Sequence, residues 1–480
     1  MNNIYDVIII GGGVIGCSIA RYLSRFNGNF LVIERHNDVG DETSSANSAI
    51  VHSGYDPKPG SLKAKFNVLG CKMMKELCEQ LDVHYINNGS LTVALNDEDY
   101  KLLIELKERA KINGVDAQLL SKEETIKLEP NINQNILGSL YCKDAGIVDP
   151  FNLTVGLMEN AMNNGCNLLL NTEICKIEKE KDIYVLTDKK NNKYFCKVLV
   201  NATGVNSELV TSYLETPNFK IYPTKGEYIL LNHFDDNFVK HTLFMCPSKV
   251  GKGVLVAPTS SLNYIVGPSA DLTDKDDTSC SSSTMSFLKE KAKNLVENVP
   301  YVHTVKCFAG VRANNDHNDF IIEESLLNKN FIKVCGIMSP GLASSPAIGD
   351  YVSTLIKEKL NLEVNEKFNP NNKKHYSVKY MNVADYDNIV KNNPLYGKFI
   401  CRCERVSEGE IVDCIHRNCG ATTLKGVKKR VRSGFGKCQG GYCQNYVVKI
   451  LSRELKKDML DVLYNELGTN ILVCDSKEAK

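Results

Sequence analysis

The most restrictive feature of this sequence lies at its N-terminus, where YDVIIIGGGVIGCSIARYLSRF joins an apolar strand, a glycine turn and an amphipathic helix. Gly11, Gly13 and Gly16 fit the G-x-G-x-x-G pattern. In that pattern the glycines permit a tight turn, close approach of the backbone to a pyrophosphate, and close packing of helix on strand. The N–H groups of the first helical turn then face the phosphates. The pattern predicts a Rossmann-like unit.

A second strand supports this interpretation. The segment NFLVIER carries Glu34, 18 residues after Gly16. A carboxylate at this distance is placed to hold ribose hydroxyls. NAD and FAD share the pattern, so these residues alone leave both cofactors open.

The segment that follows, ETSSANSAIVHSGYDPKPGSLKAKFNVLG, is rich in small hydroxyl residues. Here the sequence resembles the D-amino-acid-oxidase-like FAD superfamily. It is most similar to the glycerol-3-phosphate oxidase/dehydrogenase branch, with L-2-hydroxyglutarate dehydrogenase-like proteins as neighbours. The resemblance implies FAD and assigns His52 as the catalytic residue; because that histidine is assigned to chemistry and no attachment motif is evident, we expect the FAD to be noncovalent. Four positions become cofactor or active-site residues: Ser44, Ser45, Asn47 and the substrate-orienting Ser48.

Two further stretches match motifs of the family. The turn after the strand FCKVLVN contains Ala202 and Gly204, which the resemblance places beside the FAD adenosine. GKGVLVAP carries Lys252, which it assigns to the substrate. A solvated lysine on a tight turn is the plainer alternative.

The segment FAGVRANN carries Arg312, which the resemblance aims at the anionic group of the substrate. A guanidinium offers paired donors that match phosphate or carboxylate oxygens. The family usually has proline where Ala313 stands. Farther on, the resemblance places Gly341 and Leu342 at a helix N-terminus facing the flavin pyrimidine, with Ser339 touching substrate.

At 480 residues the chain exceeds one ordinary domain. We expect an α/β (α+β) fold with the oxidoreductase domain over residues 1–362. Within it, residues 221–305 predict a mainly antiparallel β substrate domain. Residues 363–396 are rich in Asn, Lys and Tyr and predict a linker that makes a C-terminal module, residues 397–460, separable. A tail over 461–480 follows.

Four closely paired cysteines mark the module: Cys401 and Cys403 in CRC, then Cys438 and Cys443 in GKCQGGYC. Such pairs hold zinc or an iron–sulfur cluster. Zinc ribbons favour C-x2-C pairs. This arrangement instead resembles the bacterioferritin-associated-ferredoxin-like [2Fe–2S] domain, which implies that all four cysteines bind the cluster.

The module is basic, although the net charge of the whole chain is +1. Residues 417–457 contain eleven Lys or Arg and one acid, Glu454. Nearby cations favour the reduced state of an anionic cluster. No recognition motif accompanies the patch, so nucleic acid is not an expected partner.

Eighteen cysteines without a signal peptide favour a reducing cytoplasm, and no apolar run reaches membrane-spanning length. The resemblance implies oxidation of sn-glycerol 3-phosphate to dihydroxyacetone phosphate. His52 takes the hydroxyl proton, Lys252 and Arg312 clamp the phosphate, and hydride passes to flavin N5. Electrons then leave through the cluster to a redox partner. The alternatives are an L-2-hydroxy-acid dehydrogenase of the 2-hydroxyglutarate type and an electron-transfer or iron-handling module.

Overall fold

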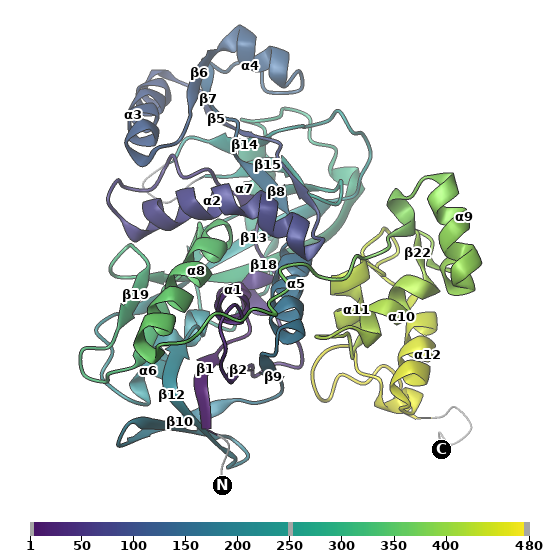
Figure 1. The fold of residues 1–480 in the computed structure, drawn as a ribbon. Helices are drawn as coiled ribbons and strands as arrows, with labels where there is room; N and C mark the ends of the chain where they lie inside the picture. Colours follow the sequence, from purple (N-terminus) through teal and green to yellow (C-terminus); the bar gives the residue numbers. More distant parts are fainter. Residues whose placement is uncertain (1–3, 248–252, 475–480) are drawn as a thin grey trace.

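The computed structural model describes residues 4–247 and 253–474. Two sheet-based parts form the body of the molecule, and a small helical module lies beside them (Figure 1). Within the described residues no helix is both long and apolar enough to cross a membrane. All eighteen cysteines lie within the described residues, and none of them forms a disulfide.

An eight-stranded sheet forms the first part. Strand β1 (Ile4–Ile10) lies parallel between β2 (Phe30–Ile33) and β12 (Lys193–Asn201). The inner ends of these strands are apolar and buried, as expected for parallel strands covered on both faces. The remaining strands are β9 (Asn167–Leu169), β10 (Ile174–Glu180), β11 (Ile183–Asp188), β19 (Ile321–Glu324) and β20 (Phe331–Cys335).

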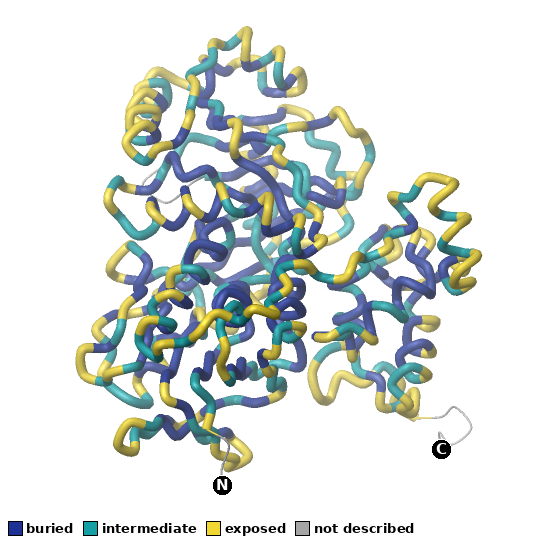
Figure 2. Tube along the Cα trace, in the orientation of Figure 1, coloured by how far each residue is buried: buried dark blue, intermediate teal, exposed yellow. Residues whose placement is uncertain are grey.

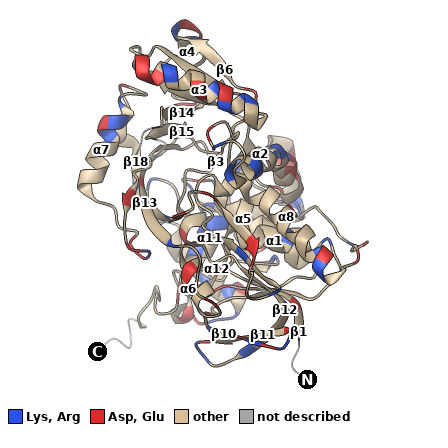
Figure 3. Ribbon diagram, turned by 90° about the vertical axis from the view of Figure 1, so that its left-hand side faces the viewer, with Lys and Arg blue, Asp and Glu red and all other residues tan. Residues whose placement is uncertain are grey.

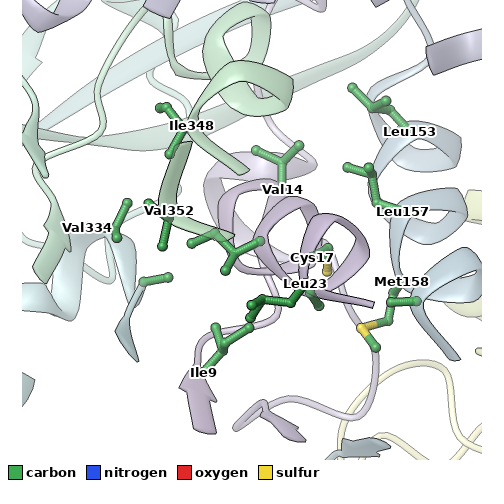
Figure 4. Packing of buried hydrophobic residues seen from close by; sticks show 14 of the residues in the cluster. Ile9, Val14, Cys17, Leu23, Leu153, Leu157, Met158, Val334, Ile348 and Val352 are labelled. Carbon is green, nitrogen blue, oxygen red and sulfur yellow. The ribbon is translucent and has the colours of Figure 1, made fainter. Parts of the chain in front are cut away.

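Helix α1 (Val14–Leu23) is the centre of the main hydrophobic core (Figure 4). It packs against α5 (Pro150–Asn163) on one side and α8 (Gly341–Leu360) on the other. Helix α2 (Leu62–Leu81) packs on α8 in turn. Elements from both ends of the domain therefore hold the glycine turn at the start of α1.

A nine-stranded sheet forms the second part. The residues predicted as a β substrate domain supply β13 (Ile221–Leu231), β14 (Thr242–Met245), β15 (Leu255–Pro258), β16 (Tyr264–Gly267) and β17 (Asp271–Leu272). The sequence did not indicate its other members, which are β5 (Ser90–Ala94), β6 (Gln118–Ser121), β7 (Gly138–Cys142) and β18 (Thr304–Asn315). The long pairing of β18 with β13 carries residues 304–315 back along this sheet.

Smaller elements complete the body. A three-stranded sheet contains β3 (Ile50–Val51), β4 (Tyr85–Ile86) and β8 (Gly146–Val148). The remaining helices are α3 (Asp97–Asn113), α4 (Lys122–Leu128), α6 (Ser207–Ser212) and α7 (Ser282–Ala292), and short 3-10 turns include η1 (Glu42–Ser44).

The segment predicted as a linker begins along the surface of the first part. The Asn365 N–H donates to the carbonyl of Arg25, and the Asn160 amide donates to the carbonyl of Asn369. The segment then forms α9 (Val383–Asn392), a helix without buried residues.

The module has its own hydrophobic core (Figure 2). Its elements are β21 (Phe399–Cys401), β22 (Val406–Ser407), α10 (Glu408–His416), α11 (Leu424–Val431) and α12 (Gln444–Leu455). Helix α10 begins with a capping box in which Ser407 and Glu410 satisfy each other's backbone N–H groups. Helix α11 lies on the side of the module that contacts α5 (Figure 1).

Candidate functional site

One cavity of about 990 Å³ lies between the two sheets and is lined by residues of both. Its size is at the upper end for small-molecule and cofactor sites. The lining includes most of the predicted site residues: Gly11, Gly13, Glu34, Ser44, Asn47, Ser48, His52, Ala202, Gly204, Arg312, Ser339, Gly341 and Leu342. Lys252 lies outside the described residues.

The glycine turn has the close contacts that the sequence pattern requires. Gly11 has φ +108°, and a Cβ there would lie 2.5 Å from the Ala202 carbonyl oxygen. Gly16 does not line the cavity; a Cβ on it would lie 1.9 Å from the carbonyl oxygen of Gly11. Its role is therefore the close packing of helix against turn, while Gly11 and Gly13 leave backbone accessible from the cavity.

The Glu34 carboxylate lies at the end of β2 beside this turn. It accepts hydrogen bonds from the N–H of Gly12 at 2.6 Å and from the N–H of His36 at 2.9 Å. Burial raises the pKa of Glu34, although both backbone donors oppose the rise. These bonds fix the carboxylate at the cavity wall, where it can accept hydroxyl donors.

The segment around η1 forms another wall. The Ser44 hydroxyl accepts a hydrogen bond from Val14 N–H at 3.0 Å, which ties the segment to the start of α1. The Asn47 side-chain carbonyl accepts from Ala49 N–H at 2.8 Å. Ser45 is turned away from the cavity lining, and its hydroxyl donates to the Glu42 carbonyl at 2.9 Å.

His52 follows β3 directly and lines the same cavity. Its ring stacks on that of Phe244, with 5.5 Å between ring centroids and an interplanar angle of 27°. Its carbonyl accepts a hydrogen bond from the Asn67 amide at 2.5 Å. The imidazole is thus held between elements of two different sheets, and imidazole is the usual general base near neutral pH.

Arg312 extends from β18 into the cavity. Its Nη2 donates to the Tyr228 hydroxyl at 3.3 Å, and no carboxylate of the described residues lies within ion-pairing distance. A Cβ on Gly226, the neighbour on β13, would lie 2.3 Å from Nη2. The guanidinium therefore occupies space that only glycine leaves, and a half-buried cation without a carboxylate favours an anionic ligand.

Helix α8 begins at the cavity with Gly341 and Leu342, and Ser339 lies just before it. No side chain caps this N-terminus. The positive end of the helix dipole therefore faces the cavity and favours negative charge there.

Sequence reasoning missed two aromatic residues of this site. Tyr228 holds Arg312 and stacks on Phe308 with 4.9 Å between centroids. Phe244 supports the His52 ring. Both lie in buried strands of the second sheet, where an aromatic side chain gives no sign that it faces a cavity rather than the core.

The four predicted cysteines of the module come together as two pairs. Cys403 and Cys438 are exposed, with their sulfur atoms 3.8 Å apart. Cys401 and Cys443 are buried, and a hydrogen bond from Cys443 lowers the pKa of Cys401 to about 6. A Cβ on Gly436 would lie 2.3 Å from Cys403 Cβ, so glycine permits the two loops to approach.

Among the described residues, no set of three or more His, Cys, Asp or Glu side chains is placed to hold a single ion. Two pairs of thiols from two loops would suit a [2Fe–2S] cluster, in which each iron takes two thiolates. Cys414 and Cys419 are buried, and burial raises the pKa of each to about 12, as for core thiols.

A nucleotide-type glycine turn that shares one cavity with a histidine and an arginine fits the class of oxidoreductases that bind a dinucleotide cofactor. Comparison with known proteins agrees. The chain belongs to the FAD dependent oxidoreductase family, whose match covers residues 6–355. Residues 399–453 match the BFD-like [2Fe-2S] binding domain.

Individual relatives are close. The chain is 44% identical to a glycerol 3-phosphate dehydrogenase of Caloramator mitchellensis over 476 residues, covering 98% of this chain and 99% of that protein. It is 34% identical to a glycerol 3-phosphate oxidase of Mycoplasma genitalium, covering 76% of this chain and 97% of the oxidase. The FAD-bound L-alpha-glycerophosphate oxidase of Mycoplasma pneumoniae superposes with a TM-score of 0.74 at 30% identity, covering 78% of this chain and all of the oxidase.

Proposed function

We propose that the protein oxidises sn-glycerol 3-phosphate to dihydroxyacetone phosphate and passes the electrons out through its C-terminal module. The observation that carries this proposal is the single cavity that contains His52, Arg312 and the glycine turn. The relatives support the substrate: a glycerol 3-phosphate dehydrogenase matches nearly the whole chain, module included. The match to the glycerol 3-phosphate oxidase covers nearly all of the oxidase and about three quarters of this chain.

We assign different roles to the side chains that line the cavity. Arg312 binds the phosphate dianion, and Ser48 and Ser339 orient the substrate. Lys252, which lies outside the described residues, is the second cation that we assign to the phosphate. His52 takes the proton of the C2 hydroxyl, which makes loss of hydride from C2 favourable. Bound FAD supplies the two-electron acceptor, and the cluster supplies a one-electron outlet. The residues that hold FAD are Gly11, Gly13, Glu34, Ser44, Asn47, Ala202, Gly204, Gly341 and Leu342.

The cluster ligands are Cys401, Cys403, Cys438 and Cys443. The exposed pair, Cys403 and Cys438, faces solvent. No carboxylate in the described residues 401–449 is exposed, whereas Arg402 and Lys437, next to these thiols, are. The Arg402 guanidinium lies over the exposed Tyr442 ring, 4.8 Å from its centroid. This edge suits an acidic redox protein as the electron acceptor.

Flavin bleaching under anaerobic conditions tests the proposal. Glycerol 3-phosphate should bleach the FAD absorbance, whereas glycerol should not, because it lacks the anion that Arg312 binds. Arg312→Ala should keep FAD but lose roughly 30-fold in kcat/KM, the equivalent of about 2 kcal/mol for a hydrogen bond to a charged group.

The same panel separates the alternatives. Faster bleaching by L-2-hydroxyglutarate would favour the hydroxy-acid dehydrogenase, since a carboxylate can also pair with Arg312. Failure of every small anionic alcohol to bleach the flavin would favour the electron-transfer or iron-handling module. Equal kinetics for Arg312→Ala and the parent chain would place Arg312 outside substrate binding.

A further inference from the structure

Residues 37–41 connect the glycine turn to the C-terminal module. This loop follows β2 and leads into η1, whose residues line the cavity. Within it, Gly40 N–H donates to the carbonyl of Gly12 at 2.9 Å, and Val39 is fully buried in the core around α1. The position of the loop is therefore coupled directly to the turn that would approach the FAD pyrophosphate.

Helix α11, which carries several Lys and Arg residues (Figure 3), contacts the other side of the loop. The Arg430 guanidinium donates to both carboxylate oxygens of Asp38, at 2.8 and 2.9 Å. Lys429 Nζ donates to the carbonyl of Val39 at 2.8 Å. The same atom lies 2.9 Å from Asp38 Oδ2 and 3.1 Å from Asp41 Oδ1. These four charged side chains are more than nine-tenths buried.

Each buried charge of the network has a partner of opposite charge, although Asp41 Oδ2 accepts no hydrogen bond; Asp41 Oδ1 also lies 3.0 Å from Lys425 Nζ on α11. Arg430 also donates to the carbonyls of Cys419 and Gly426, each at 3.1 Å. Burial by itself would raise the pKa of Asp38, but Arg430 and Lys429 hold it well below its usual range. A buried pair adds little net stability, yet removing one partner leaves an uncompensated buried charge. Such a network therefore fixes the position of residues 37–41 relative to α11 more than it adds to the stability of the fold.

We infer that the C-terminal module is part of the FAD site: Lys429 and Arg430 are positioning residues that hold residues 37–41 against the glycine turn. The composition of residues 363–396 led us to expect a separable module. On this inference, the module cannot be removed without disturbing the FAD site. A chain cut near Lys391 exposes Asp38 and Asp41 to water and frees the loop.

Another ion pair joins the module to the body without touching this loop. Arg417 Nη1 lies 3.2 Å from the Glu159 carboxylate on α5, and both side chains are buried. Helix α5 packs on α1, but Glu159 does not line the cavity. Arg417→Met is therefore a matched control, because it removes a buried cation at the same domain boundary.

The experiment uses the full chain, freed of FAD and titrated with FAD while flavin fluorescence is followed. Arg430→Met and Lys429→Met should each raise the Kd for FAD about tenfold, because the apparent Kd rises as the competent fraction of the loop falls. Arg417→Met should leave it within about twofold. Amide hydrogen exchange in the FAD-free protein should accelerate at residues 37–41 in the first two variants only.

Two results would overturn the inference. One is an unchanged FAD affinity in Lys429→Met and Arg430→Met. The other is an equal loss in Arg417→Met, which would show that general docking of the module is responsible. Should Arg430→Met fail to fold, Asp38→Asn, which keeps the side-chain shape, replaces it and should weaken FAD binding in the same direction. No substrate is present, so the outcome does not depend on the proposed function.

Discussion

At the scale of single residues, glycines place the charged groups of this protein. Gly226 leaves room for the Arg312 guanidinium beside β13. Gly310 lets β18 approach the segment around η1, since a Cβ there would lie 1.9 Å from the Ala46 carbonyl oxygen. The direction of Arg312 therefore depends on two residues that have no side chain.

Gly226→Ala should displace Arg312 without removing it. The new methyl group would lie 2.3 Å from Nη2, so the guanidinium must move away from Tyr228. We expect KM for glycerol 3-phosphate to rise roughly tenfold, about 1.4 kcal/mol of lost binding, with kcat and FAD absorbance nearly unchanged. Steady-state kinetics measure this, and a fall in kcat at constant KM would contradict it.

His52→Ala should slow flavin reduction by roughly 10²- to 10⁴-fold, the usual contribution of a general base. The FAD spectrum should stay nearly intact, because His52 lies next to Phe244 rather than in the glycine turn. Stopped-flow reduction measures the loss, and higher pH should partly restore the rate, since hydroxide can replace the missing base. A normal rate at pH 7 would exclude His52 from proton abstraction.

His36 makes stability dependent on pH. Burial would lower its pKa, but its contacts with Glu42 at 3.0 Å and the nearby Glu34 raise it to about 9. The charged form is thus favoured in the folded state, and its contribution is complete below the unfolded pKa of about 6.5 and lost as pH rises to about 9. His36→Ala should therefore lower Tm more at pH 6 than at pH 9.5.

Thermal scans of both chains with and without FAD would measure this difference. Parallel pH curves for the parent chain and His36→Ala would show that His36 does not titrate with folding.

The sequence predicted residues whose roles follow from backbone geometry or from a matching motif. Gly11 and Gly16 could be assigned because a pattern of glycines requires close approach. Asp38 and Arg430 could not, because the two are far apart in the chain and each is an ordinary surface residue by type. Only the folded arrangement of α11 against the loop makes them a pair.

At the scale of elements, the contact between α2 and α8 determines where the N-terminus of α8 lies. A Cβ on Gly70 would lie 2.1 Å from the carbonyl oxygen of Ala343, in the first turn of α8. The opposed atom is backbone, so a helix must shift to accept a methyl group.

Gly70→Ala should destabilise the protein by about 1–3 kcal/mol, the usual cost of overpacking. It should also weaken FAD binding, since Gly341 and Leu342 move with the helix. Thermal unfolding and FAD titration measure both effects. Lys75→Ala, on an exposed position of α2, serves as the control and should be nearly neutral.

The two sheets differ in how far sequence could predict them. Strand β1 ends in a continuous apolar run, residues 7–10, that leads into a glycine turn, and that local signal was sufficient. Strands β5 and β14, 152 positions apart at Ser90 and Thr242, pair in parallel. Their pairing depends on tertiary contacts, so sequence reasoning restricted the second sheet to residues 221–305 and did not indicate that β5, β6 and β7 belong to it.

At the scale of the whole molecule, the chain joins a two-electron site to a one-electron outlet. Cys438→Ser should abolish the cluster while substrate still reduces FAD, because Cys438 neither lines the cavity nor belongs to α11, whose Lys429 and Arg430 contact residues 37–41. Iron content and visible absorption should fall, and electron delivery to a one-electron acceptor should stop.

Cys474→Ser provides the control, since this thiol is exposed and far along the chain from the two pairs. Protein prepared without oxygen that contains zinc and no iron would contradict the assignment. So would a cluster that stays oxidised after substrate has bleached the flavin, once a very low cluster potential is excluded.

The ion pairs between α11 and residues 37–41 also bear on how the protein is made. A ribosome releases the nucleotide-binding half of the chain well before α11, and domains generally fold as they emerge. Until Lys425, Lys429 and Arg430 are synthesised, Asp38 and Asp41 have no cationic partners from the module. Helix α11, which is synthesised late, therefore completes the contacts that hold residues 37–41 near the N-terminus of the chain. Before that, FAD can enter a nascent site that is less constrained than the finished one.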